Sequence, residues 1–205
     1  MTHMAHHIIA CAVSVTLFTA CGHEEVVPLD VPVQLLKNGD LALRCGTSLE
    51  SHVVIGINNE NGPYSHIGLV VLLDGQWFVA HAVPGENEPG EAEYVKLEPI
   101  ETYYGNDRAK SGCIMRVSDD SAACRKATDY ALWTVKARKI FDTQFDWEDT
   151  TSLYCTELVQ QAYLHSGIDL AQDRRTRVNA ALFKGTYVFP CDITANPALR
   201  AVCEF

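Results

Sequence analysis

The spacing of apolar residues along the chain predicts a small sheet with helices packed against it. Residues 65–73 form a nearly continuous apolar run rich in branched side chains, which predicts a central strand. Asp74-Gly75 predicts a hairpin turn, and residues 76–83 alternate in the way expected of the returning strand. Shorter strands are predicted at residues 41–45, 95–97, 113–117 and 186–189.

Two segments have the spacing of amphipathic helices. Residues 119–138 begin with good N-cap side chains and predict a long helix. Residues 152–165 predict a second helix, which Thr151 or Ser152 would cap and Gly167 would end. Its apolar face would comprise Leu158, Val159, Ala162 and Tyr163. Residues 46–57 are compatible with a short helix or a loop, so the whole pattern predicts an α+β fold with a mostly antiparallel sheet.

Length and charge limit the classes of function. The chain has 205 residues, of which 47% are apolar, enough for one compact domain, which we place at residues 37–205. The net charge of −10 repels phosphate backbones, so nucleic acid is not an expected partner. The sequence contains no glycine-rich phosphate-binding loop of either common type.

The N-terminal segment predicts export. Residues 8–20 are apolar and uncharged, but about thirteen residues are too few to span a bilayer as a helix. They fit the core of a signal peptide over residues 1–20, and the following Cys21-Gly22 resembles a bacterial lipoprotein site at which Cys21 would carry the lipid. Residues 21–36 would then be a linker, and the protein would be lipid-anchored in the periplasm or at the outer membrane. A plain secretory signal and an uncleaved anchor are the alternatives.

The cysteines do not suggest a metal site. There are eight: Cys11, Cys21, Cys45, Cys113, Cys124, Cys155, Cys191 and Cys203. No CxxC pair occurs and the spacings of histidine and cysteine match no zinc template, so we expect no metal and no cofactor. An oxidising compartment could pair some of the thiols, and the neighbours in sequence are Cys113 with Cys124 and Cys191 with Cys203.

A cysteine and two histidines form a candidate catalytic set. Cys155 lies in the first turn of a predicted helix, whose free N–H groups could stabilise a thiolate and hold an oxyanion. His66 begins the central strand and could act as the base, while His81 on the paired strand could hold the productive tautomer of His66. Taken singly, a buried helical cysteine and a strand-end histidine bonded to the backbone are the more common situations.

Several sequence blocks, taken together, resemble a known family. They are Asn38-Gly39-Asp40-Leu41-Ala42-Leu43-Arg44, Tyr64-Ser65-His66-Ile67-Gly68-Leu69-Val70, His81-Ala82-Val83-Pro84-Gly85, Phe145-Asp146-Trp147 and Leu153-Tyr154-Cys155-Thr156-Glu157-Leu158-Val159. In this order they resemble the YiiX/YaeF group of permuted papain-like amidases of the NlpC-type superfamily.

The resemblance implies a fold and a set of roles. The fold would be a circularly permuted papain-like one, with a small antiparallel, barrel-like sheet and the nucleophile helix packed on it. Cys155 would be the nucleophile and His66 the general base, with His81 at a position where many relatives carry glutamate. Tyr154 and Glu157 match positions beside the nucleophile that could bind substrate or the oxyanion, although Glu157 could equally be structural.

Three functions follow from these residues. The first is a cysteine amidase or peptidase that acts on an envelope peptide or a peptidoglycan fragment through a thioester. The second keeps the nucleophile but transfers or hydrolyses an acyl group of a lipid. The third is a catalytically silent envelope binding module. The sequence does not identify the substrate, the acceptor or the oligomeric state.

Overall fold

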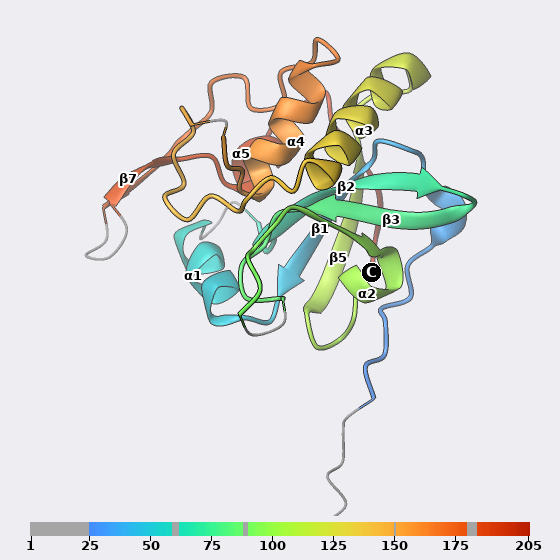
Figure 1. The fold of residues 1–205 in the computed structure, drawn as a ribbon, viewed down its shortest axis with the longest axis horizontal. Helices are drawn as coiled ribbons and strands as arrows, with labels where there is room; N and C mark the ends of the chain where they lie inside the picture. The colour runs from blue at the N-terminus through green and yellow to red at the C-terminus, as the bar shows by residue number, and fades with distance from the viewer. Residues whose placement is uncertain (1–24, 59–61, 88–89, 150, 180–183) are drawn as a thin grey trace, which may run out of the picture.

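The fold is built on one antiparallel sheet. The structure is a computed structural model, which describes residues 25–58, 62–87, 90–149, 151–179 and 184–205. The main sheet has six strands in the order β4-β3-β2-β1-β5-β8 (Figure 1). These strands are β1 (Leu41–Gly46), β2 (His66–Leu73), β3 (Gln76–His81), β4 (Lys96–Pro99), β5 (Ala109–Arg116) and β8 (Arg200–Glu204).

The helices and a separate two-stranded sheet complete the described chain. The helices are η1 (Val33–Leu35, a 3-10 helix), α1 (Leu49–Asn58), α2 (Ile100–Tyr103), α3 (Ser121–Lys136), α4 (Cys155–Leu164) and α5 (Pro190–Thr194). The second sheet pairs β6 (Thr176–Asn179) with β7 (Lys184–Tyr187).

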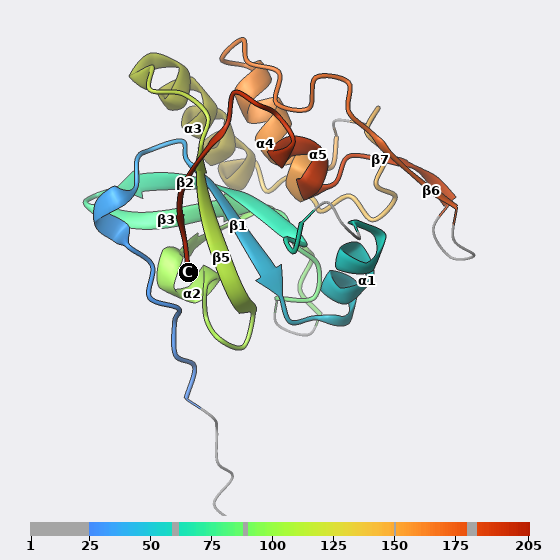
Figure 2. The same ribbon diagram turned by 180° about the vertical axis from the view of Figure 1, so that it is seen from behind.

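The two faces of the main sheet bury different helices. Figures 1 and 2 show α3 and α4 on one side of the sheet and α2 on the other. The larger core joins Ile67 and Leu69 of β2 to Val159 and Tyr163 of α4. The smaller core joins Val70 of the same strand to the α2 side. The prediction of a central strand from the continuous apolar run is confirmed, because successive residues of β2 point to opposite faces and both faces are covered.

Most long elements lie where the sequence pattern places them, and most of the ambiguous segment 46–57 lies in helix α1, which ends at Asn58. The predicted start of α4 is wrong: the helix begins at Cys155 with Tyr154 as N-cap, not at Thr151 or Ser152. The cause is a short parallel bridge that holds Leu153 extended, in which Leu153 N donates to Ile140 O at 3.0 Å. Residues paired in this way cannot also adopt helical dihedral angles.

The short elements were predicted less well. Strand β5 begins at Ala109 rather than residue 113, because pairing with β1 extends it through a stretch of low strand propensity. Strand β7 covers residues 184–187 instead of 186–189, and the elements α2, α5, β6 and β8 were not predicted. The sheet is also open, with β4 and β8 at its edges, so the expectation of a barrel-like sheet is not met.

The predicted signal peptide and lipidation site lie outside the described residues, whereas most of the predicted linker is described. Residues 1–20 and Cys21 lie outside the described residues. The part of the predicted linker that is described lies against the domain, since Leu29 N donates to Tyr104 O at 2.9 Å and Leu36 is buried. Within the described ranges, no helix combines the length and the apolar character needed to cross a membrane.

Candidate active site

Cys155 is the first residue of helix α4 and lines a cavity of about 1060 Å³. The helix starts abruptly at this point, because Tyr154 is extended as the N-cap and its backbone N donates to the Glu157 carboxylate at 3.1 Å. The N–H groups of the first helical turn have no partner within the helix, so they are available to an anion at the cavity. The sulfur thus lies where negative charge is best accommodated.

His66 lines the same cavity from the first position of strand β2. His66 is buried, with 6% of the residue exposed, and the next residue along the strand, Ile67, directs its backbone N–H at the Cys155 sulfur. The helix start and the strand start therefore meet at one point. The packing of α4 on β2 brings together His66 and Cys155, which are about ninety residues apart in the sequence.

Gly68 has a different neighbour from the one expected. The sequence suggested that this glycine leaves room for the approaching helix. A Cβ at Gly68 would instead lie 2.5 Å from Val79 Cγ1, 2.9 Å from Ala80 O and 3.0 Å from His81 Cβ, all on strand β3. The expectation was wrong, because the glycine leaves room for the neighbouring strand β3 at Val79, Ala80 and His81 rather than for the helix.

Two histidines and a carboxylate form a buried hydrogen-bonded chain. His66 Nε2 lies 3.0 Å from His81 Nδ1, and His81 Nε2 lies 3.0 Å from Glu98 Oε2. His81 is fully buried and is not among the described residues that line the cavity. The structure therefore places His81 behind His66, with Glu98 behind both.

The charge of Glu98 fixes the direction of this chain. Burial alone would raise the pKa of Glu98, but the hydrogen bond from His81 and the nearby Arg108 lower it to about 2. An ionised carboxylate only accepts, so His81 Nε2 must donate to it. Neutral His81 then accepts at Nδ1 from His66 Nε2–H, which leaves His66 Nδ1 unprotonated and able to take a proton.

Burial acts against the charged forms of both histidines and the cysteine. Desolvation lowers the pKa of His66 well below 6.5 and also lowers that of His81. Burial raises the pKa of Cys155 to about 11, although the backbone N–H groups of Ile67, Thr156 and Cys155 act in the opposite direction. The sequence had suggested a thiolate held by an imidazolium. That ion pair stays a prediction, and desolvation acts against the charged form of each group.

The two residues predicted beside the nucleophile have separate positions. Tyr154 lines the cavity and its hydroxyl accepts from Val188 N at 3.4 Å. Glu157 is not among the described residues that line the cavity; its side chain is buried at the helix start, with one oxygen bonded to Tyr154 N. Its place is structural, and the expectation that it contacts substrate is not supported. Burial, with the charges of Asp142, Asp149 and Asp146, raises the pKa of Glu157 to about 8.

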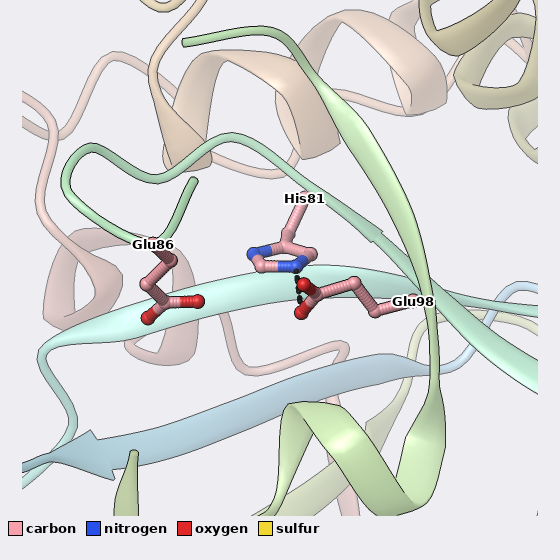
Figure 3. Close-up of side chains that lie close together, drawn as sticks. All are labelled: His81, Glu86 and Glu98. Atoms are coloured by element: carbon pink, nitrogen blue, oxygen red, sulfur yellow. Dashed lines mark hydrogen bonds and ion pairs between the residues drawn. The ribbon is translucent and has the colours of Figure 1, made fainter. Parts of the chain in front are cut away.

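A cluster of charged side chains surrounds Glu98, and sequence reasoning missed it. Figure 3 shows His81, Glu86 and Glu98 converging from β3, the loop after it and β4, with one ligand atom from each within 4.8 Å of the others. Arg44 on β1 pairs with Glu86, and Arg108 pairs with both glutamates. The register of β3 with β4 would have been the only signal, since it pairs His81 with Lys96, two residues before Glu98.

One wall of the cavity is apolar. Helix α1 contributes Leu49, Val53, Val54 and Ile57 to the lining, and Leu49 is 75% exposed. Aromatic side chains complete the apolar lining: Phe141, Phe145, Tyr154, Tyr187 and Phe189. An apolar group longer than one side chain therefore has room beside Cys155.

The cysteines that are neighbours in sequence do not form disulfides. Cys45, Cys113, Cys124, Cys155 and Cys203 are free thiols, so neither Cys113 with Cys124 nor Cys191 with Cys203 is paired. Cys155 differs from the others in lining the cavity.

Comparison with known proteins finds similarity in structure. A solved structure described as metalloprotein YiiX from Escherichia coli O157:H7, DUF1105, shares 19% of residues with this chain, and the match covers 82% of this chain and 97% of that chain at a TM-score of 0.65. No family model matches the sequence, and no curated protein does so either. At this level of identity the likeness concerns the fold alone, and the chain has a YiiX-like fold.

Proposed function

We propose that this chain is a cysteine hydrolase that cleaves an amide bond through a thioester on Cys155. The observation that carries the proposal is that Cys155, at a helix start, and His66, at a strand start, line one cavity while the Ile67 N–H points at the sulfur. In this proposal the fold is a circularly permuted papain-like one, in which the histidine precedes the cysteine along the chain.

The reaction begins from neutral groups. His66 Nδ1 takes the thiol proton as the Cys155 sulfur attacks the carbonyl carbon, so the thiolate forms only during attack. The carbonyl oxygen becomes an oxyanion, and the free N–H groups at the start of α4 stabilise it. The C–N bond then breaks, the leaving amine takes the proton from His66, and an acyl thioester remains.

Water completes the cycle. His66 Nδ1 removes a proton from a water molecule that attacks the thioester carbonyl, and the C–S bond breaks. The carboxylic acid leaves and the sulfur recovers its proton from His66. In both halves the imidazolium of His66 donates at Nε2 to His81, and His81 donates to Glu98. The carboxylate of Glu98, on the far side of the His81 ring, therefore stabilises the transient positive charge.

A trapped adduct tests the proposal. The full chain is incubated with an acyl ester probe that transfers its acyl group to reactive thiols, and the adduct is located by peptide mass spectrometry. We expect an adduct at Cys155 that Cys155→Ala removes and His66→Ala strongly slows. Cys45→Ala is a matched control, because this thiol is also free and partly exposed but lies on β1. Equal labelling of wild type and Cys155→Ala contradicts the proposal and favours a silent binding module.

A lipid-directed reaction is the second candidate, and the α1 wall favours it. Leu49 and Val53 are exposed at the cavity although they are apolar. Exposed apolar side chains that line a cavity are typical of sites that bind apolar groups. The acyl group on Cys155 would then come from a lipid and pass to an amine or to water.

Parallel incubations separate the two candidates. The protein is given a radiolabelled phospholipid in one tube and envelope peptides in another. Peptide cleavage without acyl transfer supports the amidase, whereas acyl transfer without cleavage supports the lipid-directed reaction.

We also propose that the protein acts in the cell envelope as a lipoprotein. The support is the signal-like sequence before Cys21. Incorporation of radiolabelled palmitate that Cys21→Ala abolishes would support the anchor, and incorporation independent of Cys21 would contradict it. Substrates available there are envelope peptides, peptidoglycan fragments and lipids.

A metal ion does not fit the described residues well, although the YiiX structure is described as a metalloprotein. His81, Glu86 and Glu98 have suitable donor atoms within reach of one another. Their carboxylates, however, are already hydrogen-bonded to Arg44 and Arg108, and Lys96 forms an ion pair with Glu98 at 3.7 Å. No step of the proposed reaction therefore passes through a metal.

A further inference from the structure

The cluster behind the cavity has the composition of a divalent-metal site. It offers one imidazole and two carboxylates, a donor set typical of manganese and zinc. The residues come from three separate segments, and Figure 3 shows their polar ends turned toward a common space. By donor chemistry alone, this group would be assigned to a metal.

A guanidinium nitrogen already occupies the bonding positions of both carboxylates. Arg108 Nη1 lies 3.0 Å from each oxygen of Glu98 and 3.3 Å from Oε2 of Glu86. One nitrogen thus bonds three oxygens of two glutamates, which is the relationship expected of a bridging cation. Such charge-assisted hydrogen bonds are among the strongest in proteins.

The backbone around Arg108 holds the side chain in this position. Arg108 N donates to Gly105 O at 2.9 Å and Arg108 O accepts from Thr47 N at 3.2 Å. The residue therefore enters β5 from a turn bonded on both sides, and its side chain is 23% exposed. A flexible surface arginine would lack these constraints.

The charges in the cluster leave little attraction for a dication. Glu86 and Glu98 carry two negative charges, and Arg44, Arg108 and Lys96 carry three positive charges within 4.0 Å of them. Arginine does not release its proton in proteins, so a divalent ion would have to approach a permanent positive charge or displace it.

We propose that Arg108 is the resident cation of the cluster: its guanidinium takes the place of a divalent ion between Glu86 and Glu98, and it holds Glu98 against His81 without metal. Arg108 is accordingly a positioning residue, which acts on His66 through Glu98 and His81. The positioning role rests on the proposed function, whereas the exclusion of metal does not.

Manganese titration tests the exclusion. Chelator-treated full chain is titrated with Mn2+, and free ion is counted by electron paramagnetic resonance; Mn2+ is chosen because thiolates bind it poorly. The variants are Arg108→Met, which removes the charge, Arg108→Lys, which keeps it, and Arg108→Met combined with Glu98→Gln, which removes a ligand. Circular dichroism and thermal melts verify that each variant is folded.

We expect Arg108→Met to gain one Mn2+ site. Arg108→Met should bind one Mn2+ per chain at least roughly tenfold more tightly than wild type, Arg108→Lys should resemble wild type, and the added Glu98→Gln should remove the gain. A folded Arg108→Met protein without the gain overturns the proposal. If Arg108→Met does not fold, the wild-type titration decides. Saturable binding of one Mn2+ by wild type, abolished by Glu98→Gln, overturns the proposal. Absence of such binding supports the proposal. No substrate is present, so either result is separate from the adduct experiment on Cys155.

Discussion

Glu98 Oε2 lies 3.0 Å from Nε2 of His81, and this contact determines which nitrogen of His66 can act as a base. The carboxylate can only accept, so each imidazole in the chain donates toward it. The catalytic set predicted from the sequence contained no permanent negative charge. Glu98 on β4 supplies that charge behind His81. The register of β3 with β4 therefore determines which nitrogen of His66 carries the proton.

Replacing Glu98 by glutamine should weaken the base without removing it. Glu98→Gln keeps the size of the side chain, but its amide can donate to His81 and reverse the direction of the chain. We expect the acylation rate of Cys155 by an ester probe to fall roughly 10–100-fold, within the range that general-base catalysis contributes. The rate constant is measured by intact-mass spectrometry under single-turnover conditions.

A matched change on the surface controls for this prediction. Glu101 lies three residues further along, on α2, and is exposed. Glu101→Gln should leave the acylation rate unchanged. If both variants acylate at the wild-type rate, the carboxylate does not orient the histidines.

The pH dependence of alkylation at Cys155 should show whether His66 acts on the thiol. The pKa of Cys155 is about 11 and that of His66 lies well below 6.5, both because of burial. Neutral His66 is then available throughout the neutral range. We expect the iodoacetamide rate at Cys155 to be flat near neutrality, to fall only when His66 gains a proton at acidic pH, and to rise again toward pH 11.

Removing the base should change the shape of this profile. In His66→Ala, alkylation depends on free thiolate, so the rate should rise about tenfold per pH unit up to the thiol pKa. Peptide-level quantification separates Cys155 from the other free thiols, and Cys45 in the same digest serves as an internal reference. A wild-type rate that rises about tenfold per pH unit through the neutral range, as expected of His66→Ala, would contradict the role of His66 as the base.

Hydrophobic spacing was sufficient to predict the central part of the fold. Strands β1, β2 and β3 and helix α3 lie close to the predicted ranges, because each buries a continuous apolar face. The start of α4 and the extension of β5 depend instead on partners distant in sequence. Single-sequence periodicity does not contain that information.

Some residues of the candidate site could likewise be predicted from local sequence signals, whereas others depend on tertiary contacts. Cys155, His66 and His81 follow from local signals, namely a helix start and two strands of a hairpin. Glu98 depends on the register of β3 with β4, and Arg108 on a turn that tertiary contacts fix. The pKa of Cys155 depends on burial, which the local helix position does not reveal.

A charge on the α1 wall should affect long acyl chains more than short ones. Val53 is 40% exposed and lines the cavity, so Val53→Glu adds charge where an apolar chain would lie. We expect the preference of Cys155 for a long-chain over a short-chain ester probe to fall roughly 10-fold, because each buried methylene contributes about 0.8 kcal/mol. Leu72→Glu is the control, since Leu72 is 46% exposed on β2 and is not among the lining residues described. Loss of preference in both variants would point to a general effect on solubility rather than to the wall.

Glu157 should make the protein less stable as the pH rises. Burial raises the pKa of its carboxyl from 4.5 to about 8, so the folded state holds a proton that the unfolded state has already lost between these values. Stability attributed to this group is therefore complete below pH 4.5 and decreases through pH 8. Glu157→Gln, which can still accept from Tyr154 N, should raise Tm at pH 8 by several degrees and change it little at pH 4. Differential scanning calorimetry at both pH values measures the shift, with exposed Glu148→Gln as the control. An equal shift at both pH values would mean that folding does not raise the pKa of this carboxyl.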